Sequence, residues 1–333
     1  MKIIIPMAGM GKRMRPHTLT IPKPLIRIAG KPIVQRLVED IAKVCKEKIE
    51  EISFVIGDFG KEAEDMLLSI AANVGTKGNI FYQDTPLGTA HAILCAEKSL
   101  DGKVIVAFAD TLFKADFILD ESRDGIIWVH KVKDPESFGV VKTDKDNIIT
   151  DFVEKPKKFI SDLAIIGIYY FKDGANLKKE LQFLIDNNLQ KGGEFQLTDA
   201  LENMKQKGIS FYTGKVVEWL DCGNKNATVY TNKRILEHSN GEKRISETVK
   251  VENSIIIQPC FIGENVQIIN SIIGPHVSIG ENTTIDFSVI TNSIIQSNTK
   301  ISCVNLDNSM IGNYVEYFGS KKEVSIGDYT VLS

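Results

Sequence analysis

The sequence has few cysteines and no closely spaced pair of them. The five are Cys45, Cys95, Cys222, Cys260 and Cys303, and no two stand in a CxxC spacing. The five histidines are scattered as well. Neither a zinc site nor a disulfide framework is therefore indicated.

Three further absences exclude other classes of protein. No run of about 18 apolar residues occurs, so we expect no membrane-spanning segment. The apolar stretch after Met1 is broken at Pro6 and Gly9 and is too short for a signal peptide, so we expect a cytoplasmic protein. The net charge of −3 leaves no excess of basic residues for a phosphate backbone, so we expect no nucleic-acid partner.

What is present is typical of a globular protein with two domains. A chain of 333 residues exceeds one ordinary core, and 43% hydrophobic and 25% charged residues are usual proportions. Up to residue 237, short apolar strands alternate with amphipathic helices. Strands are expected at 2–5, 52–56, 80–83 and 104–108, with helices near 33–44 and 90–96. This alternation predicts an α/β domain with a Rossmann-like, mostly parallel (mixed) sheet, whose ligands bind beyond the carboxyl ends of the strands.

The composition changes after a polar linker at residues 238–250. No Lys or Arg occurs between Val251 and Thr299. Asn-Ser followed by two apolar residues recurs from positions 253, 270, 292 and 308, and Ile-Gly recurs at 262, 273, 279, 311 and 326. This hexapeptide spacing predicts a left-handed parallel β-helix of about four to five coils over residues 251–333. The alternative is an antiparallel β-sandwich. A short solenoid with an apolar flank also leads us to expect a homo-oligomer.

The residues that could carry chemistry begin after the first strand. The small-residue loop Met7-Ala8-Gly9-Met10-Gly11 would let backbone amides approach phosphate closely, although it is neither a Walker loop nor a dinucleotide fingerprint. Arg13 and Lys23 follow, and prolines on either side restrict the backbone around Lys23. Asp110 ends a strongly apolar strand. Taken singly, each of these has an ordinary explanation as a turn residue or a surface charge.

A family resemblance joins these residues. The segment GMGKRMRPHTLTIPKPLIRIAGKPI resembles the opening motif of the sugar nucleotidyltransferases, GxGxRxxPxTxxxPKxLxxxxxKPI. The likeness continues in order through Gln83–Ala90, Ala109-Asp110, Phe138–Val141, Phe152–Pro156, Gly167–Tyr169, Gln196–Asp199 and Trp219–Gly223. The chain is similar to glucose-1-phosphate thymidylyltransferases and N-acetylglucosamine-1-phosphate uridylyltransferases, many of which carry a hexapeptide tail. The resemblance implies an enzyme of NDP-sugar biosynthesis that joins a nucleoside triphosphate to a hexose 1-phosphate and releases pyrophosphate.

The resemblance also implies a role for each matching residue. Asp110 and Asp221 would hold Mg²⁺, which prefers one or two carboxylates together with substrate phosphates. Arg13 would bind the pyrophosphate leaving group, Lys23 the triphosphate and Lys155 the sugar phosphate, so the expected catalytic residues are Arg13, Lys23, Asp110 and Lys155. The expected nucleotide-binding residues are Ala8, Gly9, Gly11, Gln83, Pro86, Gly88 and Thr89. The expected sugar-phosphate residues are Gly139, Glu154, Lys155, Gly167 and Tyr169.

The nucleotide and the sugar are only partly specified. The carboxamide of Gln83 can donate and accept at once, which matches N3–H and the adjacent carbonyl of uracil or thymine and favours dTTP or UTP. Ala109 and Thr111, which flank Asp110, depart from the family pattern, as do His17, Arg27 and Asn224. The resemblance therefore does not specify which hexose 1-phosphate is used.

Two alternative functions remain. One is acyl transfer on the β-helix, in a bifunctional enzyme, with His276 as the general base. The other is a non-catalytic regulatory subunit, against which the retained charged residues argue.

Overall fold

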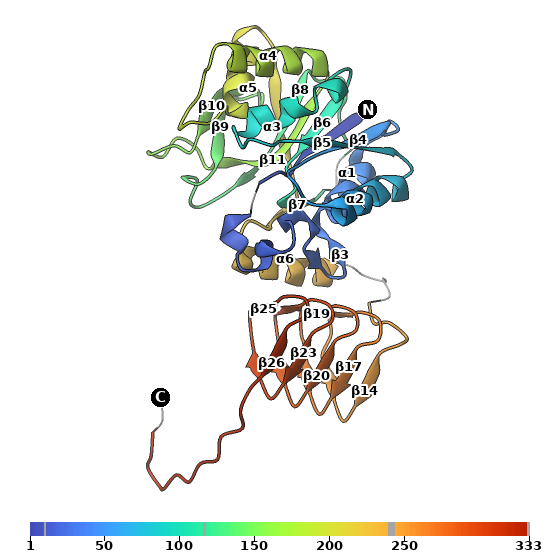
Figure 1. The fold of residues 1–333 in the computed structure, drawn as a ribbon. Coiled ribbons are helices and arrows are strands. Elements are labelled where there is room, and N and C mark those ends of the chain that lie inside the picture. Colours follow the sequence, from blue (N-terminus) through green and yellow to red (C-terminus); the bar gives the residue numbers. More distant parts are fainter. Residues whose placement is uncertain (10, 116–117, 239–243, 332–333) are drawn as a thin grey trace. The chain divides into compact units, whose positions relative to one another are not determined.

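The computed structural model describes residues 1–9, 11–115, 118–238 and 244–331 (Figure 1). The chain forms two compact units, Met1–Ile26 with Pro32–Asn224 and Arg27–Lys31 with Lys225–Ser333. In the part of the chain described here, no helix is long and apolar enough to cross a membrane. The five cysteines are free thiols.

A nine-stranded sheet forms the centre of the first unit. Its strands are β1 (Lys2–Pro6), β4 (Glu51–Ile56), β5 (Lys77–Tyr82), β6 (Val104–Ala107), β8 (Gly125–Lys131), β9 (Gly139–Thr143), β10 (Ile149–Glu154), β11 (Leu163–Phe171) and β12 (Phe211–Lys215). The order is β10-β9-β11-β6-β1-β4-β5, and β8 pairs with β11 and β12. Strands β6, β1, β4 and β5 run parallel, whereas β11 is antiparallel to β6 and β8. The predicted α/β fold with a mixed sheet is confirmed.

Helices pack on this sheet and bury its apolar strands. They are α1 (Ile33–Val44), α2 (Lys61–Asn73), α3 (Thr89–Cys95), α4 (Gly174–Asp186) and α5 (Leu197–Gln206). Helix α1 buries one face because its apolar residues recur at helical spacing. Helix α3 packs on β1 and β4 and also contacts α4 and α5. Because β1 and β6 are completely buried except at Lys2, the loops that follow them are fixed to a rigid centre.

A short antiparallel ribbon lies beside the main sheet. It is formed by β7 (Thr111–Lys114) and β13 (Glu218–Asp221), and its register sets Asp221 opposite Thr111. The backbone N–H of Cys222 donates to the carbonyl of Asp110 at 2.9 Å. Two aspartates that are far apart in the sequence are therefore fixed close together at the end of β6.

Three parallel sheets of short strands form a solenoid in the second unit. The first sheet contains β14 (Lys250–Glu252), β17 (Gln267–Ile269), β20 (Thr284–Asp286), β23 (Lys300–Ser302) and β26 (Glu316–Phe318). The second contains β15 (Ile255–Ile256), β18 (Ile272–Ile273), β21 (Val289–Ile290) and β24 (Asn305–Leu306). The third contains β16 (Cys260–Ile262), β19 (Val277–Ile279), β22 (Ile294–Ile295) and β25 (Met310–Ile311). The stacked parallel strands confirm the predicted β-helix and exclude the β-sandwich.

The recurring sequence unit has a conformational cause. Asn253, Asn270, Asn292 and Asn308 all have φ between 41° and 47°, the left-handed region that Asn tolerates better than most residues. The serine after each asparagine continues the pattern, since Ser254 Oγ accepts from Ser271 N at 2.9 Å. The Asn-Ser pair therefore makes the corner of a coil, and the second of the two apolar residues that follow packs in its interior, as Ile256, Ile273, Ile295 and Ile311 do.

The second unit begins earlier in the sequence than residue 238. Helix α6 (Lys225–His238) belongs to it, together with the turn after β2 (Arg27–Ile28). Asn232 in α6 joins them, because its Oδ1 accepts from Ala29 N at 2.9 Å and from Ser278 Oγ at 2.6 Å. The sequence instead assigns residues 1–237 to one domain. Residues 239–243 of the expected linker lie outside the described residues.

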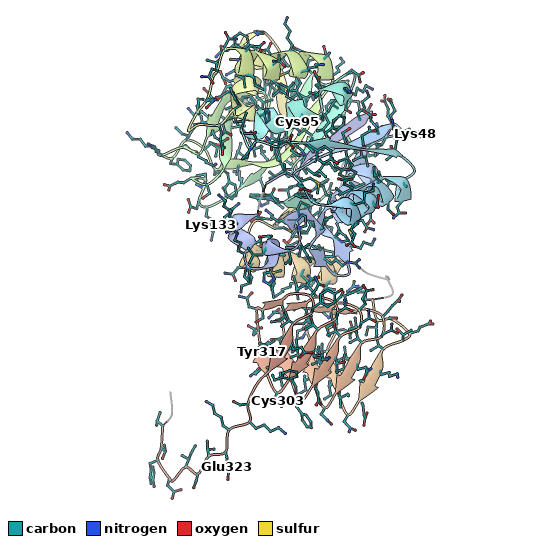
Figure 2. The ribbon with its side chains drawn as sticks, in the orientation of Figure 1. Lys48, Cys95, Lys133, Cys303, Tyr317 and Glu323 are labelled. Atoms are coloured by element: carbon teal, nitrogen blue, oxygen red, sulfur yellow. The ribbon has the colours of Figure 1, made fainter. Side chains whose placement is uncertain are left out.

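The repeat at Ile326-Gly327 is not part of a coil. Residues 319–331 contain neither helix nor strand, and nearly all of their side chains are exposed. In Figure 2, Glu323 lies on this tail, whereas Tyr317 lies on the last strand of the solenoid. The repeat pattern therefore continues in sequence beyond the last stacked strand.

Candidate active site

The loop after β1 is compact and placed by its own contacts. Three short 3₁₀ turns occupy Lys12–Met14, His17–Leu19 and Lys23–Leu25. Gly11 has φ of 57°, and a Cβ at this position would lie 3.0 Å from side-chain atoms of Thr18 and Lys23, so only glycine fits. The loop therefore folds back on itself and brings Lys23 close to Gly11.

A cavity of about 410 Å³ opens at this loop, at the carboxyl ends of β1 and β6. This is the position at which α/β sheets bind ligands. Ten of the predicted residues line it: Ala8, Gly9, Gly11, Arg13, Lys23, Gln83, Pro86, Gly88, Thr89 and Asp110. All the predicted nucleotide-binding residues and three of the four predicted catalytic residues are thus brought together.

Lys23 and Asp110 form an ion pair in this cavity. Lys23 Nζ lies 2.8 Å from Asp110 Oδ2, and Lys23 is only 9% exposed. Pro22 and Pro24 fix the backbone around the lysine, as the sequence predicts. A cation held at this depth cannot be an ordinary surface charge.

Asp221 is the second carboxylate near this pair. Its Oδ1 accepts a hydrogen bond from Gly223 N at 2.9 Å, and Gly223 lines the cavity. Burial and the neighbouring charge of Asp110 raise the pKa of Asp221, while Lys23 and Arg13 oppose this shift. Arg13, Lys23, Asp110 and Asp221 therefore form one electrostatic group.

The two aspartates fit a magnesium ion by the chemistry of their side chains. A divalent cation bound between the two side chains would offset the repulsion that the charge of Asp110 exerts on the Asp221 carboxylate. Within the described residues, no group of three or more His, Cys, Asp and Glu side chains forms a metal cluster. A site of two carboxylates completed by substrate phosphates and water is the arrangement that Mg²⁺ prefers.

Gln83 and the start of α3 also line the cavity. Gly88 has φ of 109°, and a Cβ at this position would lie 2.5 Å from the carbonyl oxygen of Phe195. Thr89 Oγ1 accepts from Leu197 N at 2.9 Å, which fixes the first turn of α3. The side chain of Gln83 is buried and donates to Gly88 O at 3.2 Å.

The predicted sugar-phosphate residues lie outside the lining of this cavity. Gly139 and Glu154 face each other on β9 and β10, and a Cβ on Gly139 would lie 3.0 Å from Glu154 Oε2. Lys155 is 62% exposed by its side chain, and its Nζ lies 3.8 Å from Glu154 Oε1. Gly167 interrupts the pairing of β11 with β8, and its carbonyl accepts from Phe108 N.

Tyr169 connects the two groups of residues. Its side chain is buried on β11, and burial raises the pKa of its hydroxyl, with smaller contributions from the charges of Glu154 and Asp110. Both carboxylates therefore lie near this ring. Since Phe108 lines the nucleotide cavity and packs edge-on against Tyr169 at 6.1 Å, Tyr169 borders that cavity.

Several residues that line the cavity were not predicted from the sequence to be site residues. These are Pro6, Met7, Lys12, Pro24, Ala92, Phe108, Ala109, Glu194 and Gly223. Lys12 lies beside Arg13 in the opening motif, so its position in the motif could have identified it. Glu194 carries no such signal, because only the folded chain brings the segment before α5 next to Gly88.

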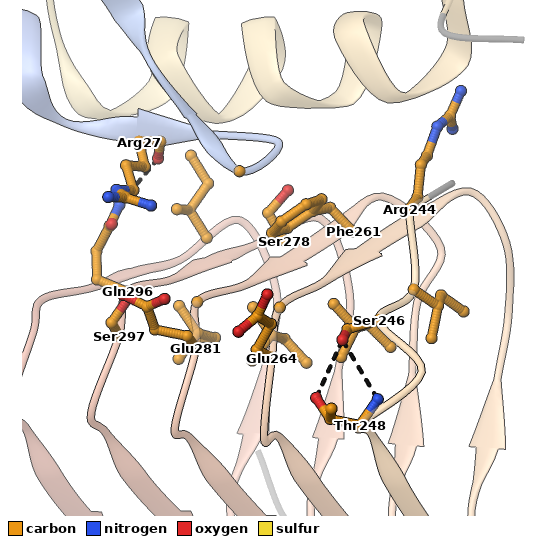
Figure 3. Close-up of a pocket in the computed structure, with 18 of the residues that line it drawn as sticks. Arg27, Arg244, Ser246, Thr248, Phe261, Glu264, Ser278, Glu281, Gln296 and Ser297 are labelled. Carbon is orange, nitrogen blue, oxygen red and sulfur yellow. Dashed lines mark hydrogen bonds between the residues drawn. The ribbon is translucent and has the colours of Figure 1, made fainter. Parts of the chain in front are cut away.

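The second unit contains a separate cavity of about 530 Å³, shown in Figure 3. Its charged lining is mixed, with Arg27 and Arg244 against Glu247, Glu264 and Glu281. Arg244 points towards α6 in Figure 3, where its Nη1 donates to the carbonyl of Leu236. None of the residues predicted for nucleotide, sugar or metal lines this cavity.

His276 occupies a corner of the solenoid, with φ of 64°. Its Nε2 lies 3.1 Å from Glu237 Oε1, and its carbonyl accepts from Asn232 Nδ2. Both partners belong to α6. The ring thus holds that helix on the solenoid, and this contact does not favour acyl transfer.

Comparison with known proteins gives a consistent family assignment. The model of the nucleotidyl transferase family matches residues 2–238. The chain is 30% identical over 268 residues to the low-salt glycan biosynthesis nucleotidyltransferase Agl11 of Haloferax volcanii, across 77% of this chain and 72% of that protein. It is 30% identical to a glucose-1-phosphate thymidylyltransferase of Streptomyces antibioticus, across 79% and 73%.

A bifunctional protein GlmU of Methanococcus vannielii is 31% identical across 78% of this chain, which spans only 61% of that longer relative. Among solved structures, a putative glucose-1-phosphate thymidylyltransferase from Bacillus anthracis aligns with a TM-score of 0.60 at 22% identity, over 73% of this chain and 97% of its own. A UDP-glucose pyrophosphorylase complexed with UDP-glucose aligns with a TM-score of 0.59 at 25% identity, over 71% and 98%.

Proposed function

Because the chain belongs to the nucleotidyl transferase family, we propose that it transfers a nucleotidyl group from dTTP or UTP to a hexose 1-phosphate, releasing pyrophosphate. The observation that carries this proposal is the buried Lys23–Asp110 ion pair in a cavity lined by Gly9, Gly11, Arg13 and Gln83. This arrangement offers cations and backbone amides for a triphosphate and a carboxamide for a base.

The reaction needs charge neutralisation more than proton transfer. The nucleophile is a phosphate oxygen of the sugar 1-phosphate, which is ionised at neutral pH, so no general base is required. It must approach the α-phosphorus of a polyanion. Two unit charges ~4 Å apart repel by about 4 kcal/mol at an effective dielectric constant of 20, and several such pairs act together. The protein therefore positions both anions for an in-line displacement and screens their charges.

The residues of the site divide this work. The backbone amides of Gly9 and Gly11 and the guanidinium of Arg13 would hold the β- and γ-phosphates, which leave as pyrophosphate. Lys23, fixed at depth, would face the α-phosphate, where negative charge accumulates in the transition state. Lys155 would hold the phosphate of the sugar, and Glu154 would accept hydrogen bonds from its hydroxyls.

We further propose that Asp110 and Asp221 hold Mg²⁺. When bound, the ion supplies positive charge to the phosphate oxygens of the nucleotide. Lys23 pairs with Oδ2 of Asp110 in the structure, and Oδ1 of Asp110 would bind the metal together with Asp221.

Replacement of Lys155 by Ala is expected to raise KM for the sugar phosphate about tenfold, because one charge-assisted hydrogen bond to phosphate is lost. The triphosphate KM should change little. Initial rates at varied sugar phosphate measure this effect, and Lys158→Ala, in the same exposed basic segment, is the matched control. An unchanged KM for the sugar phosphate in the Lys155 variant would remove Lys155 from the site.

The pH dependence of sugar binding should reveal Glu154. Burial raises the pKa of this carboxyl group, with Lys155 opposing the shift. Only the ionised form accepts freely from hydroxyls, so KM for the sugar phosphate should rise as pH falls through this raised pKa. In the Glu154→Gln variant, KM should no longer rise at this pKa. It should depend on pH only through the titration of the substrate's own phosphate. Identical pH profiles for the two proteins would contradict the assigned role.

A grid of nucleoside triphosphates and hexose 1-phosphates, assayed for pyrophosphate release with Mg²⁺, tests the proposed reaction. We expect release for a thymidine or uridine nucleotide with at least one sugar phosphate. Folded protein that releases no pyrophosphate with any pair would contradict the proposal.

A further inference from the structure

The carboxamide of Gln83 is held by two hydrogen-bond acceptors of the protein. Its Nε2 lies 3.2 Å from the carbonyl oxygen of Gly88 and 3.0 Å from His91 Nδ1. A carbonyl oxygen can only accept, so the group that faces Gly88 must be the NH₂. This contact fixes which end of the carboxamide is nitrogen. Both hydrogens of the NH₂ are then used within the protein.

His91 must be neutral to make this contact. Nδ1 accepts from Gln83 Nε2, so the ring proton lies on Nε2 of the imidazole. Burial lowers the pKa of His91, which favours this neutral form. The second contact of the same nitrogen is Cys95 Sγ at 4.0 Å, one turn further along α3.

Two groups remain available to a base at this end of the cavity. Among the described residues, neither Gln83 Oε1 nor Gly88 N has a hydrogen-bond partner in the protein. Gln83 and Gly88 both line the cavity. The site therefore offers one acceptor, the carboxamide oxygen, and one donor, the backbone N–H.

We propose that His91 is a positioning residue for base recognition, which holds Gln83 so that its oxygen selects a base with a ring N–H next to a carbonyl. This inference rests on the proposed function and specifies how the nucleotide is chosen. Uracil and thymine offer N3–H to Gln83 Oε1 and a carbonyl to Gly88 N. Cytosine places an unprotonated N3 at the same point, and two acceptors then face each other without a hydrogen. Gln83 reads the base as an acceptor only, whereas the sequence predicts that it both donates and accepts.

Without the imidazole, the carboxamide loses the acceptor that holds its second hydrogen. It can then rotate and present its NH₂ to the cavity, which suits N3 of cytosine. Replacement of His91 by Phe keeps a planar ring of similar size on α3 and removes the acceptor. The selectivity between UTP and CTP should therefore fall in this variant, even though His91 need not touch either nucleotide.

Calorimetric titration of the full-length protein with UTP and with CTP, in the presence of Mg²⁺, tests the inference. We expect the unmodified protein to bind UTP more tightly than CTP. His91→Phe should reduce the ratio of the UTP affinity to the CTP affinity about tenfold, mainly through weaker UTP binding. His91→Asn, which restores an acceptor, should recover part of the ratio. Cys95→Ala, which removes the other neighbour of Nδ1, is the matched control and should leave the ratio unchanged.

An unchanged UTP-to-CTP ratio in His91→Phe would overturn the inference, even if both affinities fell, because equal losses indicate a purely structural role. Equal binding of the two nucleotides by the unmodified protein would overturn it as well. Binding is measured without turnover, so the outcome is separate from that of the proposed reaction. Selective binding of UTP with no pyrophosphate release would contradict the transfer reaction and leave base selection by Gln83 and His91 in place.

Discussion

Replacement of Asp110 by Asn is expected to lower turnover at least ~100-fold, the scale at which removal of one preorganised electrostatic contact acts. Asn keeps the size of the side chain and its place after β6, but it removes the charge that pairs with Lys23 and that would bind the metal. The remaining activity should need more Mg²⁺, because Asp221 would then be the only carboxylate of the pair. Steady-state rates across a Mg²⁺ titration measure both effects.

Asp58→Asn is the matched control for this experiment. Asp58 is exposed and follows β4, another parallel strand of the same sheet, but it does not line the cavity. Its replacement should leave both turnover and the Mg²⁺ requirement unchanged. Near-normal turnover with a normal Mg²⁺ requirement in the Asp110 variant would rule out the metal assignment.

Replacement of Lys23 by Met is expected to lower kcat by ~100- to 1,000-fold, with a smaller effect on KM. Met preserves the length and the apolar stem of the side chain, so the buried position stays filled. It removes the cation nearest to Asp110, which we assign to the charge that develops on the α-phosphate. Single-turnover rates at saturating substrates separate this chemical step from binding.

The pair of Lys23 and Asp110 can also be tested as a unit. If the two residues act together, Lys23→Met combined with Asp110→Asn should lose little more activity than the worse single variant. Fully multiplicative losses would show that the two side chains act independently. Thermal unfolding of each variant is the control for lost structure.

Much of the first unit could be predicted because local pattern and fold agree there. The expected strands at 2–5, 52–56 and 104–108 are present as β1, β4 and β6, and the helix expected near 33–44 is α1. The restricted backbone around Lys23 was predictable from the prolines on either side of it. These features depend on hydrophobic periodicity and proline geometry, which the sequence displays directly.

Contacts between distant segments were not predictable in the same way. Asn232 and Ala29 are joined by a hydrogen bond, and that contact places α6 in the second unit. Nothing in the local pattern of 225–238 distinguishes this helix from those of the first unit. His91 is a similar case, since its position on α3 reads as an ordinary amphipathic turn until the orientation of Gln83 is known.

The repeat pattern shows a different limit of prediction from the sequence. Ile326-Gly327 has the same spacing signal as Ile311-Gly312, yet only the earlier repeat supplies a strand to the solenoid. A repeat adds a coil only when the adjacent coil offers a paired edge and an apolar face, and the sequence unit alone does not report either.

Transfer from the α-phosphorus is the central claim, and one isotope experiment tests it most directly. Uridine or thymidine triphosphate labelled separately at the α- and γ-phosphorus is incubated with the hexose 1-phosphate that the grid identifies, with Mg²⁺ or with chelator. We predict that the α-label enters a sugar nucleotide and that the γ-label leaves as pyrophosphate, only when Mg²⁺ is present. Release of the γ-label as inorganic phosphate, or an α-label that never joins the sugar, would contradict the account.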